Sequence, residues 1–294
     1  MNPGSKLRRL LSEPGALIMP GAPNALTARL IQEAGFKVLL FTGAGFANAE
    51  LAVPDLGLAT MTEVVQQIGR ITDAVDIPLV ADADTGYGNA LNVRRAVREL
   101  ERAGAAAIII EDQIWPKRCG HFDGKQVVDK EEMVAKIKAA VDAKRFSDTV
   151  IIARTDARAV YGIWEAIDRA RAYAEAGADA TFVEAPLTVE ELALIPRNIG
   201  VPQMANMVEG GKTPILPASE LEAMGFKLIA YANAALRGAI RGMQLVLAGL
   251  ARDGTTTGVL EYMVTWEERQ RLARLPEYLE LERRYTVSED QRAR

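Results

Sequence analysis

The sequence contains few reactive or aromatic side chains. It has one cysteine and one histidine in 294 residues, and only 6% of its residues are aromatic. A single cysteine cannot form an intramolecular disulfide, which excludes a disulfide-stapled secreted scaffold and predicts a reducing, cytoplasmic setting. No window reaches the roughly 20 apolar residues of a membrane span, and residues 1–20 lack the apolar run of a signal peptide. There is also no basic tract, so neither a membrane nor a nucleic acid is an expected partner.

The composition is that of a globular enzyme-sized domain. Hydrophobic residues make up 49% of the chain and charged residues 25%, with a net charge of −4. This balance allows a sizeable core and excludes disorder, collagen and a coiled coil.

One pattern recurs along the chain: an amphipathic helix, a short segment ending in glycine, and then a buried apolar run. It occurs around Gly35, Gly104, Gly177 and Gly225. Each glycine is placed to end its helix in the left-handed conformation, as in the second half of a βα unit.

Eight apolar runs alternate with these helical segments, which predicts a (β/α)8 TIM-type barrel. An open, doubly wound sheet is the alternative, but no Pro/Gly/Ser-rich linker marks a second domain. We therefore expect one domain over residues 1–294, with 250–294 as a C-terminal helical extension on the barrel or on a partner subunit. The predicted strands cover residues 16–20, 38–43, 77–84, 106–112, 149–155, 179–185, 201–206 and 227–233.

Polar residues follow six of these runs, at the barrel end where active sites form. Helix capping explains one such residue but not a convergence from six strands. The residues are Thr42 to Gly45, Asp82, Asp84, Glu111, Asp112, Arg154, Asp156, Glu184 and Asn206.

Asp82 and Asp84 are two residues apart and share one face of an extended chain. Oxygen ligands without histidine favour Mg²⁺ over zinc, and Glu111 would hold a metal-bound water. In the alternative interpretation, Asp84 only caps the following turn and Asp82 pairs with Arg154. The segment 43–45 would offer free backbone N–H groups to a carboxylate or phosphate, and Arg154 would bind a carboxylate in a bidentate manner.

The only cysteine and the only histidine lie two positions apart, in Lys117-Arg118-Cys119-Gly120-His121. A zinc site would need further Cys or His ligands, and a purely structural buried cysteine usually has apolar neighbours. Neighbouring positive charges instead lower the pKa of a thiol, which favours Cys119 as an acid, base or nucleophile.

These segments resemble the isocitrate lyase/phosphoenolpyruvate mutase superfamily over nearly the whole chain, including VPDLG, DADTGYGN, EDQIWPKRCGH, ARTDARAVYG and NMVEGGKTP. KRCGH is similar to the gating loop of the lyase branch, in which the cysteine is the catalytic acid. The resemblance implies a (β/α)8 barrel with a helix swapped between subunits of a dimer or tetramer, and Mg²⁺ dependence, with Mn²⁺ as a substitute.

The resemblance also assigns roles to individual residues. It implies metal binding by Asp82 and Asp84, with Glu111 and Asp55 nearby, and Cys119 as the catalytic residue. In the expected mechanism, Arg118 and His121 complete the catalytic group by stabilising the negative charge of the departing half. The implied substrate-binding residues are Thr42, Gly43, Ala44, Gly120, Arg154, Glu184, Asn206 and Arg237.

We therefore expect a carbon–carbon lyase that cleaves a di- or tricarboxylate with a 2-hydroxyl group, of the 2-alkylmalate or 2-methylisocitrate type, to a 2-oxo acid such as pyruvate and a second acid. Cys119 would be the general acid, and Tyr87 or Glu111 the base. Val208 and Trp266 replace a hydroxyl and a guanidinium of methylisocitrate lyases and favour the 2-alkylmalate type, whereas Arg237 favours methylisocitrate.

Several alternatives stay open at this point. An oxaloacetate hydrolase would use the same metal and loop. A phosphonomutase is disfavoured by Cys119, and a non-catalytic metabolite-binding barrel would not need that residue. A Schiff-base aldolase would need a lysine at a strand end, where neither Lys37 nor Lys212 fits well.

Overall fold

The computed structural model describes residues 2–286. The chain forms two compact units, Met1–Leu236 and Arg237–Arg294. The first unit contains every strand and the predicted catalytic segments.

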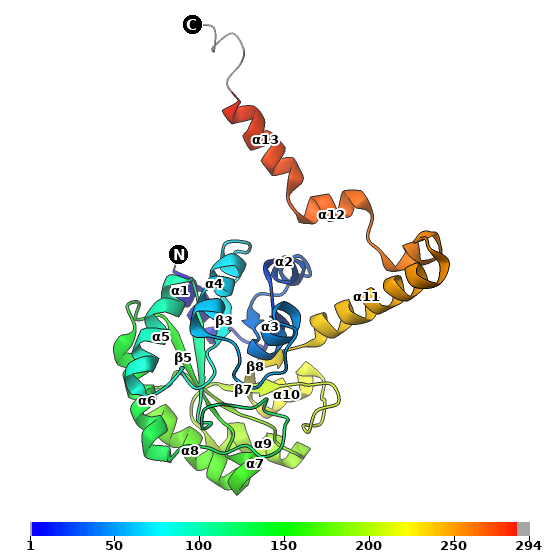
Figure 1. Ribbon diagram of the computed structural model, residues 1–294. Helices are drawn as coiled ribbons and strands as arrows, with labels where there is room; N and C mark the ends of the chain where they lie inside the picture. The colour runs from blue at the N-terminus through cyan, green and yellow to red at the C-terminus, as the bar shows by residue number, and fades with distance from the viewer. Residues whose placement is uncertain (1, 287–294) are drawn as a thin grey trace, which may run out of the picture. The chain divides into compact units, whose positions relative to one another are not determined.

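Eight parallel strands close into a barrel in the order β1 to β8, with β1 also paired to β8 (Figure 1). The predicted (β/α)8 barrel is therefore confirmed, and the open sheet is excluded. The strands are β1 Leu17–Ala22, β2 Leu39–Phe41, β3 Leu79–Asp82, β4 Ala107–Glu111, β5 Val150–Thr155, β6 Ala180–Val183, β7 Gln203–Asn206 and β8 Phe226–Tyr231.

Helices surround the barrel strands (Figure 1). Gly35, Gly104, Gly177 and Gly225 follow their helices with φ of +87°, +92°, +105° and +108°, as the repeated pattern predicted. This conformation suits glycine because it has no Cβ. The helices are α1 Pro3–Ser12, α2 Ala25–Glu33, α3 Gly43–Glu50, α4 Met61–Thr72, α5 Ala90–Arg102, α6 Lys130–Ala143, α7 Arg158–Tyr161, α8 Ile163–Glu175, α9 Val189–Asn198 and α10 Ala218–Met224.

Successive strand residues alternate between the barrel interior and the layer beneath the helices. In β4, Ile109 belongs to the interior cluster, whereas Ile108 and Ile110 pack in the outer layer. Leu7 and Leu10 of α1 join the interior cluster. Both faces of each strand are buried, which explains the continuous apolar runs in the sequence.

The same alternation places the polar side chains at the carboxyl ends of the strands. The residue two positions after an interior apolar residue also points inward. Leu40, Val80, Ile109, Ile152, Phe182 and Met204 belong to the interior cluster. Two residues later stand Thr42, Asp82, Glu111, Arg154, Glu184 and Asn206.

The second unit is helical, as predicted for the C-terminal part of the chain. It comprises most of α11 Ala234–Asp253, the 3-10 helix η1 Thr257–Tyr262, α12 Trp266–Leu272 and α13 Leu275–Tyr285. Residues 287–294 of the expected extension lie outside the described residues. The exchange of a helix between subunits and the single-domain organisation stay predictions.

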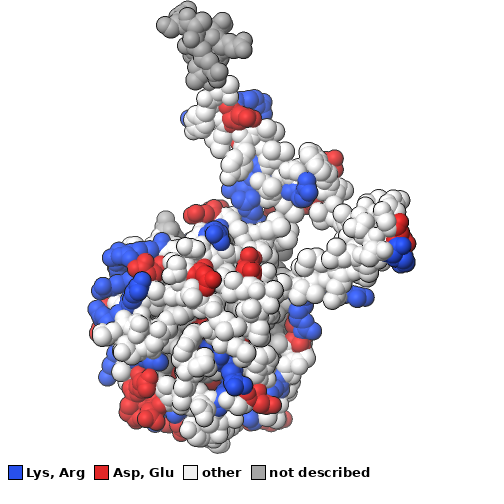
Figure 2. All heavy atoms as spheres, in the orientation of Figure 1, with Lys and Arg blue, Asp and Glu red and all other residues white. Residues whose placement is uncertain are grey.

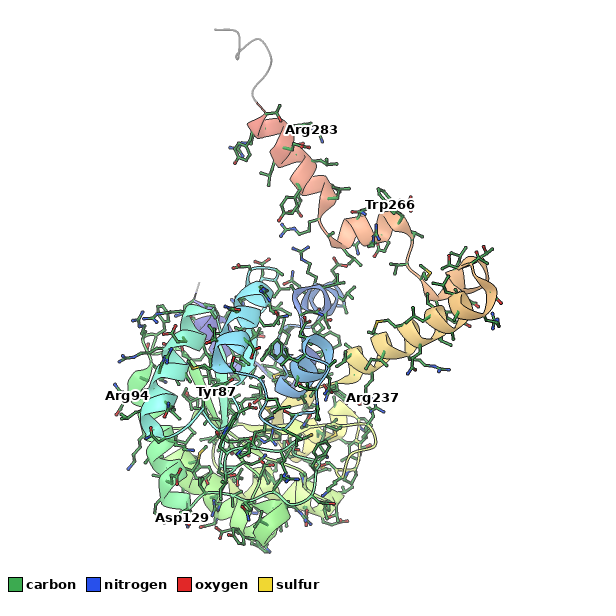
Figure 3. The ribbon with its side chains drawn as sticks, viewed as in Figure 1. Tyr87, Arg94, Asp129, Arg237, Trp266 and Arg283 are labelled. Carbon is green, nitrogen blue, oxygen red and sulfur yellow. The ribbon has the colours of Figure 1, made fainter. Side chains whose placement is uncertain are left out.

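Basic side chains gather over α5 on the face that Figure 2 shows, where acidic side chains stand among them. Arg94, labelled in Figure 3, belongs to this helix together with Arg95, Arg98 and Arg102. Within residues 2–286, no helix has both the length and the apolar character needed to cross a membrane.

Candidate active site

A pocket opens at the carboxyl ends of the strands. Strand ends and the 113–125 loop form its wall, so residues from across the barrel unit meet there. Its lining includes Thr42, Ala44, Asp55, Asp82, Cys119, Gly120, His121, Arg154, Glu184, Asn206 and Asn233, with Leu40, Ile109, Phe182, Met204, Val208 and Ala232 as apolar wall.

Thr42 and the glycines after it begin α3 at the edge of this pocket. Thr42 is the N-cap of the helix, and its Oγ1 accepts a hydrogen bond from the Gly45 N–H at 3.2 Å. The Gly43 N–H donates to Asp82 Oδ2 at 3.3 Å. The prediction of free N–H groups is therefore wrong for Gly43 and Gly45. Ala44, the residue between them, lines the pocket.

One half of the site is acidic. Lys117 Nζ lies 2.6 Å from Asp55 Oδ1 and 2.9 Å from Asp84 Oδ1, and its side chain is almost fully buried. Burial raises the pKa of Asp84 to about 6, because Lys117 only partly offsets the loss of water and the repulsion from Asp82 and Asp55. The pKa of Lys117 rises well above its usual value through Asp84 and Glu111, which outweigh its burial, so the ammonium stays charged.

The donor set of this half suits a hard divalent cation. Asp84 Oδ1 and Glu111 Oε1 are buried and lack a hydrogen bond of good geometry. In the part of the chain that the structure describes, no three His, Cys, Asp or Glu side chains are gathered so that they alone could hold a metal. Mg²⁺ commonly takes one or two carboxylates and completes its shell with water and substrate, so the residues present fit it.

Asp82 does not pair with Arg154, contrary to the alternative interpretation of the Asp82–Asp84 motif. Asp82 Oδ1 accepts a hydrogen bond from the Asp84 N–H at 3.1 Å, and its Oδ2 faces Gly43. The first contact holds the two aspartates in one turn, where Asp84 has a positive φ of 48°.

Arg154 organises the other half. Its guanidinium binds Asp156 through Nε at 2.8 Å and Nη2 at 3.1 Å, and lies 3.1 Å from Glu111 Oε2 and 3.3 Å from Glu184 Oε2. The bidentate carboxylate partner of Arg154 is thus Asp156 of the same strand end. Phe182 lies under the guanidinium, 5.3 Å from ring centroid to Cζ.

Cys119 lies in the pocket wall, but its environment differs from the predicted one. Burial raises the pKa of the thiol, and Asp55 and Glu184 raise it further, while the backbone N–H of His121 and the charge of Arg154 oppose the shift. The expected lowering of the pKa is therefore wrong. A thiol with a raised pKa stays protonated at neutral pH, which is the state that a proton donor needs.

His121 is held in one tautomer beside Glu184. Its Nδ1 accepts a hydrogen bond from the Lys212 N–H at 3.0 Å, so the neutral ring carries its proton on Nε2. This Nε2 lies 3.3 Å from Glu184 Oε1. Burial lowers the pKa of the imidazole despite the nearby Glu184 carboxylate, which keeps the ring neutral at pH 7.

Arg118 is not brought into the pocket. The residue is exposed, and its backbone N–H and carbonyl are bound by the Gln113 side chain at 3.0 and 2.8 Å. It lines a separate hollow beside Trp115 and Gln126. Lys117, which the sequence argument did not place in the site, occupies the buried position instead.

Asn233 is a pocket residue that the sequence analysis missed. Its Oδ1 and that of Asn206 are buried and have no hydrogen-bond partner among the described residues. Asn233 follows β8, so inspection of the eighth strand end would have found it. Arg237 lies near the start of α11 in the second unit, and its role stays a prediction (Figure 3).

Tyr87 and Glu111, the two base candidates, stand outside the pocket lining. Burial and the nearby Asp84 raise the pKa of Tyr87, which is labelled in Figure 3, well above its usual value. Its hydroxyl is buried without a hydrogen bond among the described residues. Burial likewise raises the pKa of Glu111, although Arg154 opposes the shift.

The phosphoenolpyruvate phosphomutase family model matches residues 7–251, and the chain belongs to this family. The resemblance to the isocitrate lyase/phosphoenolpyruvate mutase superfamily is confirmed. The chain is 47% identical to 2,3-dimethylmalate lyase of Eubacterium barkeri over 98% of its length and 99% of that protein. It is 43% identical to 2-methylisocitrate lyase of Aeropyrum pernix over 90% of its length and 85% of that protein.

Solved structures agree with these relatives. A crystal structure of 2,3-dimethylmalate lyase matches with a TM-score of 0.91 and 37% identity, covering 97% of this chain and 95% of that one. Oxaloacetate acetylhydrolase bound to 3,3-difluorooxalacetate matches with a TM-score of 0.90 and 35% identity, covering 96% of each chain. Phosphonopyruvate hydrolase in complex with oxalate and Mg²⁺ matches with a TM-score of 0.86 and 33% identity, covering 97% of this chain and 99% of that one. The chain is accordingly an enzyme of the oxo-acid-lyase type.

Proposed function

We propose that this enzyme is a Mg²⁺-dependent lyase that cleaves a 2-alkylmalate-type dicarboxylate to a 2-oxo acid and a second carboxylic acid, with Cys119 as general acid. One observation carries the proposal: the only thiol of the chain lines the same pocket as Asp82 and Arg154.

Asp82 and Asp84 would hold the cation, with Glu111 and Asp55 around them. When bound there, Mg²⁺ would supply Lewis acidity to the 2-hydroxyl group and its neighbouring carboxylate, and Mn²⁺ would substitute for it. Glu111 Oε1, which is buried without a hydrogen-bond partner among the described residues, supports this assignment.

In the proposed reaction, a base removes the 2-hydroxyl proton, the bond between C2 and C3 breaks, and its electron pair moves to C3 of the departing half. The Cys119 thiol then donates its proton to that carbon. Arg154, with Thr42, Ala44 and Asn206, would bind the substrate carboxylates. Glu111 is the better base candidate of the two, because the phenol of Tyr87 is harder to deprotonate.

The apolar wall of the pocket supports an alkyl-bearing substrate. Leu40, Phe182, Met204 and Val208 line it without a second arginine among the described lining residues. An alkyl group gains from burial there, whereas a third carboxylate would need a cationic partner. This favours a dicarboxylate over 2-methylisocitrate.

Oxaloacetate hydrolysis is the second candidate, favoured by the similarity to oxaloacetate acetylhydrolase. It would need the same pocket but a water molecule as nucleophile. We further propose a homo-oligomer, a dimer or tetramer, supported by the exposed apolar side chains Leu247, Leu260 and Trp266 of the second unit.

The test is Mg²⁺-dependent 2-oxo acid release from 2,3-dimethylmalate, 2-methylisocitrate and oxaloacetate, with wild type and Cys119→Ser. We expect cleavage of 2,3-dimethylmalate and a loss of about 10²- to 10⁴-fold in kcat for the variant. Consumption of oxaloacetate alone, with release of oxalate, would establish the hydrolase instead. Turnover of 2,3-dimethylmalate that survives Cys119→Ser would remove Cys119 from the mechanism.

Thermal unfolding of both proteins, with and without Mg²⁺, is the control. The variant should keep the stability and the Mg²⁺ response of the wild type, because serine is close to cysteine in size. A loss of activity together with a loss of this response would point to a disturbed pocket rather than to a missing acid.

A further inference from the structure

Lys125 is a buried lysine at the end of the 113–125 loop that the proposed mechanism does not use. Its side chain is 1% exposed, and its Nζ lies 2.9 Å from Asp156 Oδ1, a carboxylate that is itself fully buried. The same Nζ donates a hydrogen bond to the carbonyl of Gly120. Burial of an ammonium group is costly unless it is paired, so these two partners fix the side chain.

Asp156 is a rigid anchor for this contact. Its backbone N–H donates to Asp112 Oδ1 at 2.9 Å. Asp112 Oδ2 in turn accepts hydrogen bonds from Thr155 Oγ1 at 2.7 Å and Tyr173 OH at 2.9 Å. Arg154 also binds Asp156, so both of its carboxylate oxygens are engaged.

Gly120, the other partner, is pressed against the pocket. A methyl group on Gly120 would lie 2.5 Å from Glu184 Cγ and 2.6 Å from Arg154 Nη2. The backbone of Gly120 therefore packs directly on two side chains that line the pocket, and Cys119 precedes it in the chain. A shift of the Gly120 carbonyl would move the thiol as well.

The loop has a second lysine contact at its other end, where Lys117 binds Asp55 and Asp84. That contact involves a carboxylate assigned to the cation, so its effect on the loop is not separable from metal binding. Among the described residues, Lys125 makes no hydrogen bond or ion pair with Asp82 or Asp84.

We propose that Lys125 is a positioning residue: by joining Asp156 to the Gly120 carbonyl, it holds the 113–125 loop closed over the pocket and aims Cys119 at the substrate. The effect of Lys125 on catalysis rests on the proposed function. Its effect on the loop rests on the contacts alone, so the two effects can be tested separately.

The experiment compares wild type with Lys125→Met, Lys125→Arg and the control Lys130→Met. Lys130 makes an ion pair of 2.6 Å with Asp168, but on the surface, where both side chains are partly exposed. The first readout is hydrogen exchange of peptides from the loop without substrate. We expect hydrogen exchange at residues 117–124 to be at least about tenfold faster in Lys125→Met than in the wild type. The rate should recover partly in Lys125→Arg and stay unchanged in Lys130→Met.

The second readout is turnover of the substrate found above. Lys125→Met should lower kcat about tenfold or more with a smaller change in KM, because the acid is misplaced while the carboxylate-binding residues remain. Unchanged exchange in the loop would overturn the proposal. Faster exchange with unchanged kcat would also overturn it, because the loop would then be held without effect on the acid.

Two further outcomes keep the test decisive. If Lys125→Met does not fold, Lys125→Gln, which keeps an amide donor, takes its place with the same criteria. If no substrate is turned over by the wild type, the proposed function fails, but hydrogen exchange still decides whether Lys125 holds the loop.

Discussion

Asp84 and Asp156 are both buried aspartates that follow a barrel strand, yet their pKa values move in opposite directions. That of Asp84 rises to about 6 and that of Asp156 falls to about 2. Burial raises the pKa in both cases, but Arg154 and Lys125 together outweigh it at Asp156, whereas Lys117 alone does not at Asp84. The Asp156 carboxylate is saturated with cationic partners, whereas the Asp84 carboxylate is unsaturated because Lys117 offsets only part of the cost of its burial.

This difference separates the tasks of two aspartates that are not among the lining residues of the pocket but contact residues that are. The saturated side holds Arg154 and the loop in place, and its carboxylate has no capacity for a ligand. The unsaturated side pays a cost in the free protein that a bound cation would relieve. Three predictions test this division, beginning with the largest expected effect.

Asp156→Asn should destabilise the fold by about 3–5 kcal/mol, because Lys125 would lose its charged partner inside the protein and Arg154 would lose one of three. Denaturant unfolding measures the free energy of unfolding. Asp168→Asn is the matched control, since Asp168 binds Lys130 at the surface and should change stability by less than about 1 kcal/mol. Equal effects of the two substitutions would contradict the assigned role of Asp156.

Asp84→Asn should lower Mg²⁺-dependent turnover by on the order of 100-fold and raise the Mg²⁺ concentration needed for half-maximal activity. Without Mg²⁺ and at pH 4, its stability should stay within about 1 kcal/mol of the wild type, because Asp55 still pairs with Lys117. Calorimetric titration with Mg²⁺ measures the affinity directly. Wild-type affinity in the variant would remove Asp84 from the metal site.

The pH dependence of stability should differ for the two aspartates. The raised pKa of Asp84 means that the folded state binds the extra proton, so its contribution is favourable below about pH 4 and is lost as the pH rises through 6. The lowered pKa of Asp156 contributes stability above about pH 4, which is lost as the pH falls through 2.

In metal-free protein, the wild type should therefore lose about 1–3 kcal/mol relative to Asp84→Asn between pH 4 and 7. Unfolding by denaturant at several pH values measures this difference. Saturating Mg²⁺ should reduce the loss in the wild type. If the free energies of unfolding of the two proteins change in parallel with pH, the charged form of Asp84 does not destabilise the fold.

The barrel and most of its polar residues were predictable because both follow from local rules. Residues two positions apart in a strand point to the same side, so Glu111 faces inward because Ile109 does, and Arg154 faces inward because Ile152 does. The loop was less predictable. Neighbours in an irregular segment point in different directions, and the sequence does not decide that Lys117 turns inward while Arg118 faces solvent.

The thiol shows the same limit. Three basic residues lie near Cys119 in the sequence, but none places a free positive charge at the sulfur atom. The charge of Lys117 is balanced by two carboxylates, Arg118 is exposed, and His121 is neutral. Asp55 and Glu184 come from distant segments and raise the pKa of the thiol. Charge that is close along the chain was therefore a poor guide to charge at the sulfur atom.

The pairing of β1 with β8 sets when the pocket can exist during synthesis. Leu17 pairs with Leu228, so the seam closes only after about 210 further residues have been made. At roughly 5–20 residues per second, a ribosome needs about 10–40 s for that stretch. Until then β1 lacks its β8 neighbour, and the nascent chain does not yet contain Asn233, which follows β8. A nascent chain therefore completes the pocket at the carboxyl ends of its strands late in translation, when the last strand is added.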